Sequence, residues 1–244
     1  MLSFLRKVKF FTLKMRSEHK IRPLKIKIGY IKNLEGSAFV EMGNTKVLCG
    51  VKLEVGVPNF LRGSGEGWIT ANYSMFPKTS KEVDRRAIEI SRIIGRSLRA
   101  VVNRKIFPNY TCVVNCEVLE ADGGTRIASI IGGFCSIYQC FLSMEKTGKI
   151  ERLPIKEYLG AISIGLLKNK IIVDMNYEQD SQADVDMNIV MTENEKIIEL
   201  QVSSEKENVT LDFNKLKEMF EIGKEAIKEV IKIEKEAIKN QLLR

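Results

Sequence analysis

The segment that most constrains the fold is a mostly apolar stretch near the middle of the chain, residues 126–145, "RIASIIGGFCSIYQCFLSME". The stretch predicts a helix, and its composition indicates that this helix is buried. No uninterrupted apolar run approaches the roughly 20 residues that span a bilayer. We therefore expect the core helix of a soluble protein, and we expect no membrane partner.

The predicted elements on either side of this helix follow a similar order in each half of the chain. Apolar and alternating runs predict strands at residues 24–31, 38–43, 46–55, 69–76 and 110–121, with later hairpins at 160–175 and 187–202. Helical periodicity predicts helices at 82–103 and 212–243. Because strands precede a helix in both halves, the order predicts an α+β fold with duplicated β-hairpin and helix halves. No Pro/Gly/Ser-rich linker divides the halves, so we expect a single domain over residues 15–244.

The positive charge of the chain is concentrated at its N-terminus. The formal net charge is +8, and residues 1–33 contain ten Lys or Arg against the single acid Glu18. A basic segment of this kind suits a polyanion such as RNA, because neutralising phosphates drives sequence-independent binding. The alternative is a solubilising, Lys-rich edge strand. Residues 1–14 are basic and free of acids, and they are either a weak targeting segment or an extension upstream of Met15.

The cysteines and the histidine argue against two classes of site. The five cysteines form no CxxC pair and His19 is the only histidine, so we do not expect a zinc site. Catalysis by a Ser-His or Cys-His pair would have to use His19, which lies in the basic N-terminal stretch. The cysteines lie on apolar elements, which predicts reduced core thiols and a cytoplasmic location, or a nuclear or organellar one in a eukaryote.

The helix predicted at residues 82–103 is amphipathic, and Asp84 is placed to cap its start. Its apolar face includes Ile90, Ile94 and Leu98. The opposite face carries an arginine stripe, defined as Arg85, Arg92, Arg96 and Arg99. This stripe is either a solvated face, in which Glu89 pairs with Arg92 or Arg96, or a contact for RNA or a neighbouring subunit.

The stretch "EADGGTRIAS", residues 120–129, joins a predicted strand to the apolar helix. Gly123 and Gly124 permit unusual dihedrals and a close backbone approach, and Thr125 is a candidate N-cap. The helix N-terminus offers free N–H groups, and the fork of Arg126 fits a phosphate. The stretch is therefore either an oxyanion cradle or an ordinary turn in which Arg126 pairs with Asp122.

A second polar cluster, "EQDSQADVDMN", spans residues 178–188. If this segment is extended, Asp180, Asp184 and Asp186 project from one face because their spacing is even. Carboxylates this close need a cation, a shared proton or solvent, and they suit a hard cation such as Mg²⁺. The cluster is either a magnesium site, which could neutralise a phosphodiester or a leaving oxygen, or an exposed acidic loop.

These segments together resemble the ribonuclease PH family, which includes subunits of polynucleotide phosphorylase and of the exosome core. The similarity runs from about Arg22 to the C-terminal helix. It rests on "RPLKIKIGYIKNLEGSAFVEMGNTKVLCGV", "VPNFLRGSGEGWITANYSMFP", "DRRAIEISRIIGRSLRAVV", "EVLEADGGTRIASI" and "EQDSQADVDMNIVMTE". The resemblance implies a ribosomal-protein-S5-domain-2-like α+β fold. It also implies 3′→5′ trimming of RNA, such as tRNA or rRNA, by inorganic phosphate with release of nucleoside 5′-diphosphates.

The resemblance further implies roles for individual residues. The phosphate-binding positions of the family correspond to Arg86, Gly124, Thr125 and Arg126. Its catalytic, metal-linked aspartates correspond to Asp180 and Asp186, which would hold Mg²⁺, with one of them assisting proton transfer to the leaving 3′-oxygen. Contacts with RNA are expected from Lys78, Lys81, Arg85 and Arg92.

The resemblance implies a ring, either a homohexamer built as a trimer of dimers or a mixed exosome-type ring. Two segments depart from ribonuclease PH itself. "MFPKTSKEVDRR" is shorter than the arginine-rich loop that helps to hold tRNA, and "TLKMRSEHK" stands in place of "RPDGR". The leading hypothesis is an active phosphate-dependent exoribonuclease. The alternative is a non-catalytic or partner-dependent RNA-binding subunit of an exosome-like ring.

Overall fold

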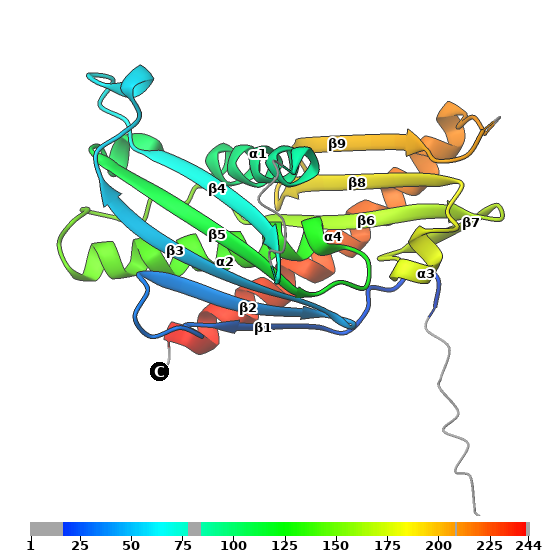
Figure 1. Ribbon diagram of the computed structural model, residues 1–244, viewed down its shortest axis with the longest axis horizontal. Helices are drawn as coiled ribbons and strands as arrows, with labels where there is room; N and C mark the ends of the chain where they lie inside the picture. The colour runs from blue at the N-terminus through cyan, green and yellow to red at the C-terminus, as the bar shows by residue number, and fades with distance from the viewer. Residues whose placement is uncertain (1–16, 78–83, 208, 243–244) are drawn as a thin grey trace, which may run out of the picture.

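The computed structural model describes residues 17–77, 84–207 and 209–242. Their strands form a five-stranded sheet with the order β1-β2-β3-β5-β4 and a four-stranded sheet with the order β7-β6-β8-β9. Figure 1 shows the two sheets side by side. The strands of the first are β1 (Leu24–Ile28), β2 (Gly36–Met42), β3 (Thr45–Val55), β4 (Trp68–Met75) and β5 (Tyr110–Glu120). Those of the second are β6 (Leu159–Leu167), β7 (Lys170–Val173), β8 (Val185–Thr192) and β9 (Ile197–Ser204).

The helices are α1 (Arg85–Ala100), α2 (Thr125–Lys146), α3 (Tyr177–Asp180) and α4 (Phe213–Leu242). Two short 3-10 turns occupy Asn59–Leu61 and Arg104–Ile106. In each half of the chain, strands lead into a long helix that ends the half. The predicted α+β fold is therefore confirmed, and the predicted strands and long helices are all present.

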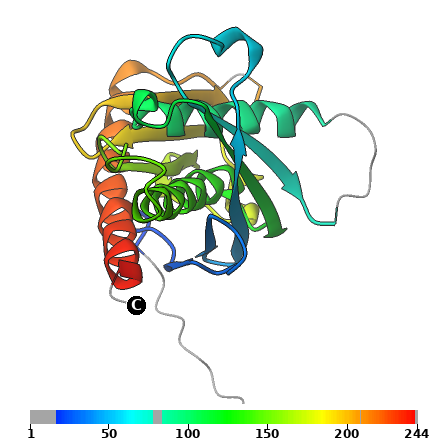
Figure 2. The same ribbon diagram turned by 90° about the vertical axis from the view of Figure 1, so that its left-hand side faces the viewer.

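The apolar helix α2 lies at the centre of the molecule. It packs against β2, β3 and β5 of the first sheet, against β6 of the second, and against α1 and α4. Figure 2 looks along α2, with α4 (red) to its left. An 18-residue window of α2 is apolar enough to cross a membrane, contrary to our expectation, but 78% of that window is buried inside the protein. Because α2 is enclosed on several sides, it needs apolar side chains around most of its circumference.

Helix α1 packs on β4 and α2 and reaches β9 of the other sheet. As predicted, the Asp84 side chain caps its start by accepting from the Ala87 N–H at 3.0 Å. Ile90, Ile94 and Leu98 are buried, which confirms the predicted apolar face.

The predicted arginine stripe is only partly a solvated face. Arg85 and Arg92 are exposed, but Arg96 pairs with Glu199 of β9 at 2.8 Å rather than with Glu89. The Arg99 guanidinium lies 4.3 Å from the ring centroid of Trp68, and it donates to the Ile69 carbonyl at 2.7 Å. Arg96 is itself exposed, so only its partner differs from the expected Glu89, whereas Arg99 is half-buried because β4 approaches the C-terminal half of α1.

Helix α4 connects the two sheets. It contacts β6, β7 and β8 of the second sheet and β1 of the first. Gly160 of β6 permits this approach, since a Cβ there would lie 2.9 Å from two side-chain carbons of α4. One hydrophobic cluster includes buried residues from both sheets and from α1, α2 and α4.

The five cysteines are free and buried, as predicted for core thiols. The Cys49 and Cys116 sulfurs lie 3.5 Å apart across the β3–β5 pair. Strand β1 is an edge strand with exposed Lys25 and Lys27, so this part of the basic N-terminal region is a Lys-rich edge. The predicted extension at residues 1–14 lies outside the described residues.

Candidate active site

The glycine turn between β5 and α2 forms one wall of the candidate site. Gly123 and Gly124 have φ values of 73° and 69°, which side-chain-bearing residues rarely adopt. Gly124 is the N-cap of α2, and no side chain caps this start. The predicted N-cap, Thr125, is instead the first helical residue, and its hydroxyl accepts from the Tyr73 hydroxyl at 2.9 Å. The first N–H groups of α2 lack intrahelical acceptors and are suited to an anion.

Arg126 extends from α2 toward the second sheet. Its guanidinium donates to the side-chain carbonyl of Gln201 on β9. Asp122 instead accepts from the Tyr177 backbone N–H at 3.1 Å and from the Asn44 side chain at 3.0 Å. The expected pairing of Arg126 with Asp122 is therefore not formed, because Asp122 holds the start of α3 and the β2–β3 turn.

Arg86 lies at the start of α1 and is exposed. Its positive charge lowers the pKa of Asp180, and so does that of Arg126, against the larger effect of burial. The same two arginines oppose the rise that burial causes in the pKa of Tyr73. The structure therefore brings Arg86 and Arg126, which are far apart in the sequence, to one site beside the start of α2.

The three aspartates do not project from one extended strand as predicted. Asp180 is the last residue of the short helix α3, and the side chains of Asn176 and Gln179 fix the start of that helix as a capping box. Asp186 lies on β8. Asp184 precedes β8 and accepts from Lys206 Nζ at 2.7 Å and from the Lys168 N–H at 2.9 Å, which lower its pKa. Asp184 thus links the turn between β6 and β7 to the segment that follows β9.

Asp180 and Asp186 nevertheless lie close enough to influence each other. Burial, together with the charge of Asp180, raises the pKa of Asp186 to about 6. Hydrogen bonding from Asn188 at 2.8 Å and the charge of Arg126 oppose this rise. Burial also raises the pKa of Asp180. Two carboxylates that repel each other thus lie beside the cationic wall formed by Arg86 and Arg126.

This carboxylate pair fits a magnesium ion better than a metal that requires a full protein cage. Within the described residues there is no group of three or more His, Cys, Asp or Glu that could hold a metal. Mg²⁺ commonly binds through one or two carboxylates and keeps water or substrate phosphate as its remaining ligands. Asp180 and Asp186 supply this donor set, and a cation between them would relieve the repulsion that raises the pKa of Asp186.

Several residues behind the site were missed by the sequence analysis. Arg22 is 7% exposed, Asp174 is fully buried, and their side chains form an ion pair at 2.7 Å. Asp174 follows an apolar strand, which is a usable signal for an acid held at a strand end. Arg22 is one of ten basic residues in the N-terminal region, and nothing local distinguishes it from the others.

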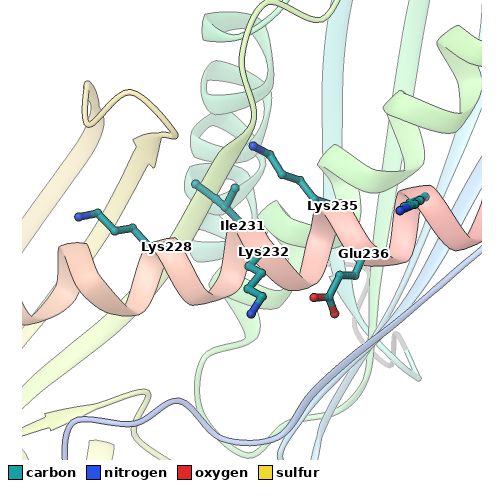
Figure 3. Close-up of a pocket in the computed structure, with 6 residues that line it drawn as sticks. Lys228, Ile231, Lys232, Lys235 and Glu236 are labelled. Atoms are coloured by element: carbon teal, nitrogen blue, oxygen red, sulfur yellow. The ribbon is translucent and has the colours of Figure 1, made fainter.

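Of the residues predicted to contact RNA, Arg85 and Arg92 are exposed on α1, and Arg85 is adjacent to Arg86. Lys78 and Lys81 lie outside the described residues. Basic side chains also line a hollow on the outer face of α4, shown in Figure 3 with Lys228, Lys232 and Lys235. Lys228 pairs there with Glu225 at 2.9 Å and with Glu195 at 3.1 Å, so part of this charge is balanced locally.

Two models of one protein family match most of the chain. The model of the 3′ exoribonuclease family, domain 1, matches residues 20–142, and that of domain 2 matches residues 157–226. The chain belongs to the 3′ exoribonuclease family. The resemblance drawn from the sequence motifs is thereby confirmed.

Solved structures share the fold of this 3′ exoribonuclease family member. A chain of an archaeal exosome core has a TM-score of 0.76 and 22% identity, covering 90% of this chain and 89% of that one. A chain of the Archaeoglobus fulgidus exosome with RNA bound to the active site has a TM-score of 0.76 and 23% identity, covering 88% and 89%. Rice (Oryza sativa) Rrp46 has a TM-score of 0.73 and 18% identity, covering 91% and 98%. At these identities the likeness shows the fold alone.

Proposed function

We propose that this protein is a phosphate-dependent 3′→5′ exoribonuclease. An oxygen of inorganic phosphate forms a bond to the phosphorus of the terminal RNA linkage, and the bond from that phosphorus to the 3′-oxygen breaks. The nucleoside leaves as its 5′-diphosphate, and the shortened RNA keeps the 3′-oxygen, which takes up a proton. The observation that best supports this proposal is that the cationic start of α2 lies beside the carboxylate pair Asp180 and Asp186.

The attacking phosphate is assigned to the α2 side of the site. The N–H groups at the start of α2 favour an anion, and Arg126 and Arg86 add two guanidinium groups. Gln201 holds one guanidinium nitrogen of Arg126 and so restricts its orientation. Two arginines would offset the repulsion between the attacking phosphate and the RNA phosphate, which is the main electrostatic cost of bringing two anions together.

The leaving 3′-oxygen is assigned to the aspartate side of the site. Asp180 and Asp186 would hold Mg²⁺, which supplies positive charge for the RNA phosphate and the departing oxygen. One of the two carboxylates would also assist proton transfer to the leaving 3′-oxygen.

The test is an assay of the purified chain with 3′-tailed RNA and Mg²⁺, with and without inorganic phosphate. We expect nucleoside diphosphates only when phosphate is present. Nucleoside monophosphates formed without phosphate would indicate a hydrolase instead. No product from a folded protein that binds RNA would contradict the proposal and favour the second candidate.

Arg126→Ala should lower phosphate-dependent turnover by about 100-fold or more, because it removes a charged donor from the reacting phosphate. Arg152→Ala, a change at an exposed arginine on the turn between α2 and β6, is the matched control. The measurement is the rate of diphosphate release at saturating RNA, with circular dichroism to confirm folding. Equal rates for the two variants would reject the phosphate role of Arg126.

The second candidate is a non-catalytic or partner-dependent RNA-binding subunit of a ring. The likeness to chains of exosome cores favours this alternative, since such chains act within larger assemblies. Either candidate predicts RNA binding and assembly into a homohexamer or a mixed ring. Light scattering of the isolated chain distinguishes these assemblies, because a chain that needs partners should not form a closed ring alone.

A further inference from the structure

We infer that Arg22 and Thr45 set the phosphate affinity of the site by orienting the N–H groups of the glycine turn, Gly123 and Gly124. This inference rests on the proposed phosphate site and deepens it. Neither residue lies among the predicted site residues, because both act on backbone carbonyls on the far side of the turn. They are positioning residues rather than catalytic ones.

Arg22 holds the two carbonyls of the turn with separate nitrogens. Its Nη1 donates to the Asp122 carbonyl at 2.5 Å, and its Nη2 donates to the Gly123 carbonyl at 3.2 Å. Nη2 also donates to Asp174 Oδ1 at 2.7 Å, and the Arg22 backbone N–H donates to Asp174 Oδ2 at 2.8 Å. The buried carboxylate therefore fixes the guanidinium, and the fork of the guanidinium fixes the turn.

Thr45 holds the same turn through its hydroxyl. Its Oγ1 donates to the Gly123 carbonyl at 2.6 Å and accepts from the Asp122 N–H at 2.9 Å. The Thr45 side chain is fully buried at the start of β3. The Gly123 carbonyl thus receives two donors, one from Arg22 and one from Thr45, and both lie on the same side of the turn.

The orientation of the N–H groups follows from peptide geometry. A trans peptide is planar, and its N–H points opposite to its C=O. The Asp122–Gly123 and Gly123–Gly124 peptides are trans, and their carbonyls face Arg22. The N–H groups of Gly123 and Gly124 must therefore point away from Arg22. Neither N–H donates to a backbone acceptor among the described residues, so both are available to an anion near the start of α2.

The experiment compares the deletion of a buried hydroxyl at the turn with the deletion of a buried hydroxyl elsewhere. Thr45→Val removes the hydroxyl while keeping the side-chain shape, and Thr45→Ser keeps the hydroxyl. Thr111→Val is the matched control, because Thr111 is also buried and donates to a backbone carbonyl, that of Gly56, at 2.7 Å. Arg22→Lys keeps the charge next to Asp174 but loses the fork that joins two carbonyls.

The readouts are the dissociation constant of inorganic phosphate, from ³¹P NMR line broadening, and that of RNA, from fluorescence anisotropy. Thr45→Val should weaken phosphate binding about three- to tenfold, and Arg22→Lys by at least as much. RNA binding should stay within about twofold, because base and sugar contacts are untouched. Thr45→Ser and Thr111→Val should bind phosphate like the parent protein.

Unchanged phosphate affinity in Thr45→Val would overturn the inference, and so would an equal loss in Thr111→Val, which would indicate a general effect on folding. A parent protein that binds RNA but no phosphate would also overturn it. The expected affinity pattern without any release of nucleoside diphosphates would support the inference while rejecting the proposed exoribonuclease activity.

Discussion

The ionisation of Asp186 links the structure of the site to its expected pH dependence. Burial and the charge of Asp180 raise its pKa to about 6, so the carboxyl changes charge just below neutral pH. The protonated form cannot neutralise a cation. Because Asp180 and Asp186 repel each other, any change at one of them should appear in the titration of the other.

We predict that kcat/KM for phosphorolysis falls as the pH drops through about 6, since protonation removes the negative charge of Asp186. Asp180→Asn should lower the pKa of Asp186, because the neighbouring charge that disfavours its ionised form is lost. Steady-state kinetics across the pH range measures kcat/KM, and carboxyl ¹³C NMR of the folded protein measures the pKa of Asp186 without requiring activity. Asp212→Asn, at an exposed position before α4, is the control and should leave the titration unchanged.

Among the structural elements, the turn between β5 and α2 has no room for a side chain at Gly123. A Cβ at Gly123 would lie 2.4 Å from the Met175 carbonyl oxygen, at the entrance to α3. This close approach lets Asp122 in the turn accept from the Tyr177 N–H at the start of α3. The position of Asp180 at the end of α3 therefore depends on the absence of a side chain at Gly123.

We predict that Gly123→Ala destabilises the protein more than Gly148→Ala. Both glycines have positive φ, at 73° and 69°, so both variants pay about 1–2 kcal/mol of backbone strain. Nothing lies within 4 Å of a Cβ at Gly148, whereas Gly123→Ala also forces the turn and α3 apart, at a further cost of about 1–3 kcal/mol. Urea unfolding measures the difference, and equal losses would show that the contact with Met175 is unimportant.

The sequence predicted the regular elements well because they have clear periods. The β-hairpins and the long helices were found at or near their observed bounds, and Asp84 was identified as a cap. Helix α3 was missed because four residues are too short for a period, although the Asn176–Gln179 capping box was a readable signal. That omission produced the wrong expectation of a single extended face for Asp180, Asp184 and Asp186.

The contacts that complete the site could not be predicted, because they join residues far apart in the chain. Arg22 meets Asp174 across 152 positions, and Arg126 meets Gln201 across 75. Residue type and local spacing contain no information about such partners. The motif "GGTR" could indicate an anion site, but only the fold shows which residues hold its carbonyls.

In the molecule as a whole, α4 joins both sheets and carries a buried acid next to α2. Glu234 is fully buried, and neither carboxylate oxygen has a hydrogen-bond partner among the described residues. Burial raises the pKa of Glu234 well above 4.5. Burial also raises the pKa of the Cys135 thiol on α2, and a negative charge on Glu234 would add to that rise. The folded protein therefore retains a proton on Glu234 that the unfolded chain releases.

The buried acid Glu234 should make the protein less stable as the pH rises. Because the folded-state pKa is the higher one, its contribution is fully present below about pH 4.5. Stability is then lost, at about 1.4 kcal/mol per pH unit, until the folded-state pKa is reached. Glu234→Gln should flatten this decline in the unfolding free energy above about pH 4.5, whereas the exposed Glu229→Gln should not. Parallel curves for all three proteins would contradict this account.

The five buried thiols can serve as probes of local unfolding. Cys49, Cys112 and Cys116 lie in the first sheet, and Cys135 and Cys140 lie on α2. A thiol reagent can reach each sulfur only while the surrounding structure is open, so its modification rate measures the frequency of that opening. Since α2 is enclosed by both sheets, the strand and helix cysteines should be modified together. A helix cysteine that reacts well before the others would reveal a partial opening around α2.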